Sequence, residues 1–228
     1  YQFRTLPFKC NRTFTLTLSM PDILINTENI FLNRGICELL SEIAKEEHIR
    51  EPYSVVDCST DILDPIDMLF TEMAAGEHYL CHPFFKKLPP HTSIFIFVAT
   101  DSALQVEQLP LCLRDATFIS MNSDLRRVKN QIAKRLTEST TSSCGGLEKD
   151  SRRCVKCPRL TLTKSQLYII NAIRTGMNNQ QIAQKLGISH KTIFSHKINI
   201  MKKFQIATKQ ELTRFSSVAL ALSAGRIG

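Results

Sequence analysis

The stretch GISHKTIFSHKINIMKKF, residues 187–204, concentrates positive charge on what its spacing predicts to be a single helix. It contains two histidines, no acid, and four lysines: Lys191, Lys197, Lys202 and Lys203. Several cations on one helix can hold a polyanion by neutralising its charges, as lysines do on the phosphates of nucleic acid. The alternative is a solvated surface helix that binds nothing. The charge of the remaining chain helps to decide between them.

The excess of positive charge belongs to one end of the chain. The 228 residues carry a net charge of +8. Residues 151–228 contain fourteen lysines and arginines against one acid, Glu211, a net charge of +13, whereas residues 1–150 contain fifteen against twenty, a net charge of −5. A basic segment joined to an acidic one indicates a polyanionic partner for the basic segment alone.

The basic helix has one face for packing and one for contact. A short helix over 179–186, a turn containing Gly187, and the basic helix over 190–204 make a helix-turn-helix pattern. Ile193 and Ile200 recur at helical spacing on the packing side. The DNA-contacting residues that we predict are Lys191, Thr192, Phe194, Ser195, Lys197, Ile198 and Lys202. The apolar Phe194 and Ile198 suit the thymine methyl groups of a major groove better than they suit water.

The residues from Leu160 to Leu212 resemble the LuxR-type (NarL/FixJ) DNA-binding domain. The resemblance rests on Leu162-Thr163, Gly176, the Asn-x-x-Ile-Ala run at 179–183, and the Ile-Ser-x-Lys-Thr-hydrophobic-x-x-His run at 188–196. The SHKINIMKK ending is similar to that of the capsule-synthesis co-activator and fimbrial-regulator branch. Phe194 stands where many members carry Lys or Ser, so the base preference of the family does not carry over.

The resemblance implies a small all-α domain of four helices that binds double-stranded DNA. Capping residues place these helices at 164–175, 179–186, 190–204 and 209–223. Family members pair through the fourth helix, which implies a homodimer or a heterodimer with another regulator. The apolar residues that could serve that pairing are Leu212, Phe215, Ala219 and Leu222, although the core of the domain needs some of them too.

The first part of the chain follows a different pattern. Strands expected at 22–26, 53–58, 92–100 and 116–120 alternate with helices at 30–47 and 123–136, which predicts an α/β domain with a parallel sheet. A stretch rich in Ser, Thr and Gly follows, which is typical of a linker. We therefore expect an α/β domain over 1–137, a linker over 138–158, and the helix-turn-helix domain over 159–228.

By the same resemblance, the α/β domain is receiver-like, and phosphoryl transfer in a receiver needs clustered acids for Mg²⁺, an aspartate at a strand end, a hydroxyl residue and a lysine. Asp57 and Thr100 each end an expected strand. Glu28, however, is one acid where two are expected, and Met121 stands in the place of the lysine. The interval from Glu28 to Asp57 has room for one helix only, so a strand–helix unit is missing. These departures predict a degenerate receiver, with Asp57 as the candidate phosphoacceptor if the domain is active after all.

The sequence offers no constellation for catalysis, and we expect a protein that is not an enzyme and uses no cofactor, metal or small-molecule ligand. Two clusters come nearest to a metal site, and each lacks a fourth ligand: Cys144, Cys154 and Cys157, and His78, Cys81 and His82. The absence of an export signal and of any apolar run long enough for a bilayer favours a cytoplasmic protein, bound to the nucleoid when it holds DNA.

The sequence therefore predicts a bacterial DNA-binding transcription regulator that phosphorylation does not control. Two alternatives stay open. One is a phosphorylation-dependent response regulator that uses Asp57, and the other is a protein-interaction co-regulator with weak intrinsic DNA specificity.

Overall fold

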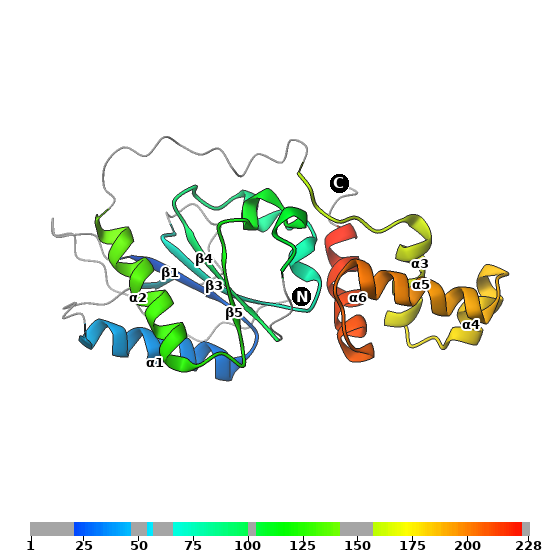
Figure 1. The fold of residues 1–228 in the computed structure, drawn as a ribbon, viewed down its shortest axis with the longest axis horizontal. Helices are drawn as coiled ribbons and strands as arrows, with labels where there is room; N and C mark the ends of the chain where they lie inside the picture. Colours follow the sequence, from blue (N-terminus) through cyan, green and yellow to red (C-terminus); the bar gives the residue numbers. More distant parts are fainter. Residues whose placement is uncertain (1–20, 47–53, 57–65, 100–103, 142–156, 225–228) are drawn as a thin grey trace. The chain divides into compact units, whose positions relative to one another are not determined.

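The structure is a computed structural model that describes residues 21–46, 54–56, 66–99, 104–141 and 157–224 (Figure 1). The chain divides into two compact units. The first comprises residues 1–71, 87–95 and 123–148, and the second comprises residues 72–86, 96–122 and 149–228. Four residues weighed above lie outside the described ranges: Asp57, Thr100, Cys144 and Cys154.

A five-stranded sheet confirms the predicted α/β fold. Its strands are β1 (Asp22–Asn26), β2 (Ser54–Val56), β3 (Met68–Met73), β4 (Ser93–Val98) and β5 (Thr117–Ser120), in the order β2-β1-β3-β4-β5. β1 pairs in parallel with both β2 and β3, and Leu24 lies opposite Val56 on one side and Leu69 on the other. This order belongs to the doubly wound folds, in which ligands bind beyond the carboxyl ends of β1 and β3.

β3 is the strand that the sequence patterns did not predict, and the inference of a missing strand is therefore wrong. Met68, Leu69 and Phe70 are each 0% exposed, and the Phe70 ring stacks on that of Phe95 with centroids 4.8 Å apart. Residues 68–71 and 73 of the strand are buried and Glu72 alone is exposed, so its sequence lacks the regular alternation that marks a half-exposed strand. With β3 in place, β2, which directly precedes Asp57, is an edge strand.

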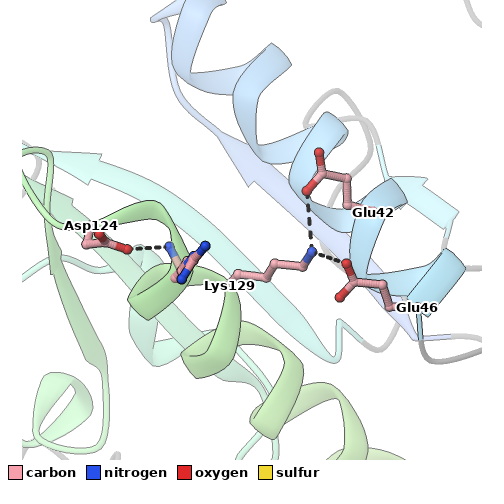
Figure 2. Close-up of polar contacts among 5 residues, drawn as sticks. Glu42, Glu46, Asp124 and Lys129 are labelled. Atoms are coloured by element: carbon pink, nitrogen blue, oxygen red, sulfur yellow. Dashed lines mark hydrogen bonds and ion pairs between the residues drawn. The ribbon is translucent and has the colours of Figure 1, made fainter.

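Two helices of the first unit, α1 (Ile30–Glu46) and α2 (Leu125–Thr141), lie side by side (Figure 1). Each buries an apolar stripe: Ile36, Leu39, Leu40 and Ile43 on α1, and Val128, Ile132 and Leu136 on α2. Lys129 Nζ joins them, 2.5 Å from Glu46 Oε1 and 3.5 Å from Glu42 Oε2 (Figure 2). In the described connections that follow β3 and β4, short 3₁₀ turns stand instead of α-helices: Glu77–Tyr79, Phe84–Lys86, Val106–Gln108 and Leu111–Leu113.

Four α-helices at the end of the chain confirm the predicted helical domain. They are α3 (Lys164–Arg174), α4 (Asn179–Leu186), α5 (His190–Lys203) and α6 (Lys209–Ala224). Their shared core includes the fully buried Ile169, Ile170, Ile182, Ile193, Ile200, Phe204 and Phe215. Within the second unit, Tyr79 and Leu109 belong to the same buried cluster.

The apolar residues of α6 serve this core. Leu212, Phe215 and Ala219 are at most 3% exposed, so they are not available to a second subunit. Leu222, the fourth residue expected at a pairing surface, is also packed against the cluster in part. Among the described residues, no helix combines the length and the apolar character needed to cross a bilayer.

Candidate nucleic-acid interface

The lysine-rich stretch folds as α5, and local chemistry fixes where it begins. Gly187 ends α4 in the left-handed region, with φ 64°, and the Ile188 amide donates to the Ala183 carbonyl over 3.1 Å. Ser189 then caps α5, because its Oγ accepts from the Thr192 amide over 3.1 Å. Glycine after one helix and serine before the next are the residue types that such a tight turn requires. The turn therefore sets the angle at which α5 leaves α4.

The two preceding helices, α3 and α4, also begin at side-chain caps. Asn178 and Gln181 form a capping box at the start of α4, with both hydrogen bonds at 2.9 Å. Thr163 and Gln166 form another at the start of α3, at 3.0 and 3.2 Å. Reciprocal caps satisfy amides that would otherwise lack partners at a helix start. Both capping boxes confirm the sequence reading of these helix starts.

One face of α5 holds the helix in its domain. Ile193 and Ile200 are 0% exposed and share a buried cluster with Ile182 and Ala183 of α4. Burial of one isoleucine side chain contributes about 1.5–3 kcal/mol. The predicted division of α5 into a packing face and an outward face is therefore confirmed for its packing face.

The outward face gathers most of the residues that the sequence singled out. Lys191, Thr192, Phe194, Ser195 and Lys202 are exposed, and Ile198 is half-buried. Phe194 is 56% exposed, which is a large apolar surface to leave in water. Ser195 Oγ donates to the Lys191 carbonyl over 3.1 Å, and the Thr192 hydroxyl lies 2.8 Å from Ser189 Oγ. The face thus combines cations, small hydroxyl groups and one aromatic ring.

Two lysines of α5 donate hydrogen bonds to other parts of the helical domain. Lys197 Nζ donates to Asn179 Oδ1 of α4 over 2.5 Å, and burial, followed by the nearby charge of Lys209, lowers the pKa of Lys197. Lys203 Nζ donates to the Thr161 carbonyl over 2.7 Å. The structure therefore separates Lys197 from the outward set in which the sequence placed it. Asn179, the acceptor, was not among the predicted site residues, since its sequence position suggests only a helix start.

The positive charge of this domain has little internal compensation. Glu211 is the one acid in the described residues 157–224. It caps α6, where its Oε2 accepts from the amides of Ala207 and Thr208, each over 2.9 Å. No ion pair within the described part of the chain involves a lysine of α5. The outward lysines are thus available to an external anion.

The carboxyl ends of β1 and β3 are the second place where a ligand is expected in this fold. β1 is followed by Thr27 and Glu28, and β3 by Ala74, Ala75 and Gly76. In the described ranges, no three His, Cys, Asp or Glu side chains lie together as metal ligands would.

The cluster near residue 80 is buried. Glu77 Oε2 accepts from the Ala74 amide over 2.8 Å, and Oε1 lies 3.5 Å from His82 Nε2. Burial raises the pKa of Glu77 to about 7 and lowers the pKa values of His78 and His82 to about 4. His78 is 3% exposed, and neither ring nitrogen has a hydrogen-bond partner. Cys81, the third residue that the sequence grouped here, is 2% exposed.

Comparison with known proteins gives matches for both parts of the chain. Residues 160–216 match the family described as bacterial regulatory proteins, luxR family. The oxygen regulatory protein NreC of Staphylococcus carnosus (strain TM300) is 29% identical over 102 residues, which are 45% of this chain and 47% of that protein. NreC of Staphylococcus aureus (strain JH9) is 39% identical over 59 residues, 26% of this chain and 27% of that protein. The chain thus spans at most about half the length of these relatives.

Among solved structures, RcsB from Salmonella enterica serovar Typhimurium, bound to promoter P1flhDC in the presence of phosphomimetic BeF₃⁻, superposes with a TM-score of 0.52. The match covers 88% of this chain and 99% of that chain at 17% identity. At this identity the likeness concerns the fold, a receiver-like domain followed by a helix-turn-helix domain.

Proposed function

Because the chain carries a domain of the luxR family of bacterial regulatory proteins at residues 160–216, we propose that it is a transcription regulator that binds double-stranded DNA through α5. The observation that carries this proposal is the outward face of α5, where Lys191 and Lys202 have no acid beside them and Phe194 is 56% exposed. Lysines of this kind neutralise phosphates, and an apolar side chain in a major groove contacts thymine methyl groups. We call α5 the recognition helix.

In the proposed mechanism, the outward residues of α5 divide into two groups. Lys191 and Lys202 contact phosphates, which fixes the helix in the groove without reading sequence. Phe194, Ser195 and Ile198 lie between them along the helix and contact base edges. The proposed protein is a regulator and not an enzyme, and it works in the cytoplasm, where bacterial DNA lies. One recognition helix reads one half-site, so we further propose a dimer, formed with itself or with a second regulator.

The direct test is binding-site selection with the full chain, followed by titration of the recovered duplex at several salt concentrations. We expect the logarithm of the affinity to fall linearly with the logarithm of the salt concentration, with a slope of about −0.9 for each phosphate neutralised. A scrambled duplex serves as the control and should bind more weakly at physiological salt. Recovery of no preferred sequence, or an affinity that does not depend on salt, would overturn the proposal.

We also propose that phosphoryl transfer does not control this protein. The support comes from the end of β3, where the three residues that follow the strand, Ala74, Ala75 and Gly76, carry no carboxylate. Glu77, the next acid, is engaged with the Ala74 amide and lies near His82. A carboxylate with these partners is less available as a ligand for Mg²⁺.

Acetyl phosphate with Mg²⁺ tests this second proposal on the full chain. We expect no stoichiometric phosphoryl adduct, and we expect DNA affinity to stay the same in the Asp57→Asn variant. An adduct that forms on the parent chain and is lost in Asp57→Asn would establish the alternative, a response regulator that uses Asp57.

A further inference from the structure

We infer that Lys197 is a positioning residue for DNA binding: its hydrogen bond to Asn179 holds the angle between α4 and the recognition helix, and it does not contact a phosphate. This inference rests on the proposed function, since it concerns how the same helix is presented to DNA. The sequence alone suggested the opposite role, because a lysine on the most basic helix of the chain is expected to meet the polyanion.

The first argument is the direction of the side chain. Lys197 is half-buried, and its Nζ lies 2.5 Å from Asn179 Oδ1 on the neighbouring helix. Lys191 and Lys202 on the same helix are exposed. An ammonium group committed to a partner on α4 is directed toward the domain, whereas a phosphate contact requires it to point into solvent.

The second argument is where the bond lies. The Gly187 turn joins the end of α4 to the start of α5, so it fixes the two helices at one end only. Asn179 is the first residue of α4, at the end far from the turn, and Lys197 lies about two helical turns into α5. The bond therefore closes the open side of the two-helix angle. Without it, the angle depends on the turn and on apolar packing, which is less directional than a hydrogen bond.

The third argument is that the cap of α4 does not use the Asn179 side chain, which can therefore accept the hydrogen bond from Lys197. Asn178, and not Asn179, caps α4 through its exchange with Gln181, so the Asn179 amide group is not used at the helix start. Hydrogen bonds from charged donors are about twice as strong as neutral ones. Burial and the charge of Lys209 both lower the pKa of Lys197, so the ammonium is maintained there against two unfavourable effects. The Lys197 ammonium therefore has its partner within the domain, at Asn179.

The salt dependence of DNA binding distinguishes a positioning role for Lys197 from a phosphate contact by Lys197. The probe is the duplex that binding-site selection recovers with the parent chain. We expect Lys197→Met to weaken binding about tenfold, the effect of losing one hydrogen bond from a charged group, and to leave the log–log salt slope unchanged. Lys202→Met is the matched control from the exposed face of the same helix. It should make the slope less steep by about 0.9, as the loss of one phosphate contact requires.

The Asn179→Leu variant tests the partner. It should weaken binding as much as Lys197→Met does, and the double variant should lose no more than either single variant, because both remove the same bond. Lys197→Arg, which keeps a charged donor, should restore most of the affinity. Thermal melts without DNA show whether each variant is folded, and a variant that does not fold is replaced by Asn179→Ala or Lys197→Gln in the same cycle.

The outcomes distinguish a failure of the proposed DNA binding from a failure of the positioning role of Lys197. If the parent chain selects no duplex, the proposed function fails. If the parent binds and Lys197→Met flattens the salt slope as Lys202→Met does, or if the losses from Lys197→Met and Asn179→Leu add, Lys197 contacts a phosphate and this inference is wrong.

Discussion

At the scale of single residues, the exposed fraction of each side chain distinguishes the residues of the recognition helix that can contact bases from those that pack in the core. Phe194 is 56% exposed, while Ile193 beside it is 0% exposed. An aromatic ring left in water at the centre of a basic helix is consistent with a partner surface that is itself apolar in part. In a major groove, that surface is the methyl group of thymine.

Replacing thymine by uracil in the selected duplex tests this reading directly, because it removes the methyl group and keeps every hydrogen bond. We expect binding to weaken about three- to fourfold for each contacted methyl group, from about 0.8 kcal/mol per buried carbon. The Phe194→Ser variant should show a smaller difference between the thymine and uracil duplexes than the parent chain does. Equal binding of the two duplexes by the parent chain would show that Phe194 does not contact a thymine methyl group.

His78 gives a prediction about pH. Its ring is 3% exposed, neither nitrogen has a partner, and burial lowers its pKa from 6.5 to about 4. Between these two values the unfolded chain binds more protons than the folded chain, so the free energy of unfolding falls as the pH falls. The contribution of His78 to this fall is about 2 kcal/mol between about pH 7 and about pH 5.

Urea unfolding at a series of pH values measures this contribution. The His78→Phe variant keeps a ring of similar size and has no group that titrates, so its stability should fall less than that of the parent over this range. The exposed His190, changed to Phe, serves as the matched surface control. If His78→Phe and the parent lose stability in parallel, then His78 is solvated or paired in solution.

At the scale of elements, the helices were predictable and one central strand was not. The four C-terminal helices begin with local signals, such as the capping pair Asn178 and Gln181, that act within a few residues of sequence. β3 has no such signal, because a short buried apolar run fits a strand and a helix segment equally well. Pro65 and Gly76, which flank it, were the available hints. Missing β3 also led to the wrong inference that a strand–helix unit is absent from the domain.

The same reasoning explains which site residues the sequence could identify. The outward positions of α5 follow from helical periodicity alone, and Lys191, Phe194, Ser195 and Lys202 are exposed as expected. The direction of Lys197 depends on where Asn179 lies, eighteen residues earlier in the chain. Contacts between elements of this kind require tertiary geometry, which periodicity does not contain.

Packing between elements gives the next prediction. Ile200 is 0% exposed in the core of the helical domain, so Ile200→Ala should lower the free energy of unfolding by about 2–5 kcal/mol and lose DNA binding through unfolding. Ile198→Ala, the control on the outward side, should melt close to the parent temperature and alter only the sequence preference. Thermal melts beside binding-site selection measure both effects. An Ile200→Ala chain that melts with the parent would place Ile200 outside the core.

At the scale of the whole molecule, stretches far apart in sequence meet within the second unit at the end of the recognition helix. Tyr79 is fully buried there, its hydroxyl donates to Gln205 Oε1 over 2.5 Å, and its carbonyl accepts from the Leu160 amide over 3.1 Å. Gln205 itself has φ 55°, in the left-handed region that a residue other than glycine seldom adopts. The turn after α5 is therefore held by residues that precede the helical domain in the chain.

Gly76 allows a test of this close approach. A Cβ at Gly76 would lie 2.7 Å from the Phe204 carbonyl oxygen and 2.9 Å from Phe204 Cβ, while one at Gly176 would have no atom within 4 Å. The backbone φ is almost the same at both, +80° and +79°, so an alanine is strained by about 1–2 kcal/mol at either position. Gly76→Ala should therefore lower the free energy of unfolding by about 1–3 kcal/mol more than Gly176→Ala does, because its methyl group must displace the backbone after α5. Denaturant unfolding of the two variants gives this difference with the backbone strain cancelled. Equal losses would mean that Gly76 and Phe204 are not in contact in solution, and the turn that ends the recognition helix would then be held by the helical domain alone.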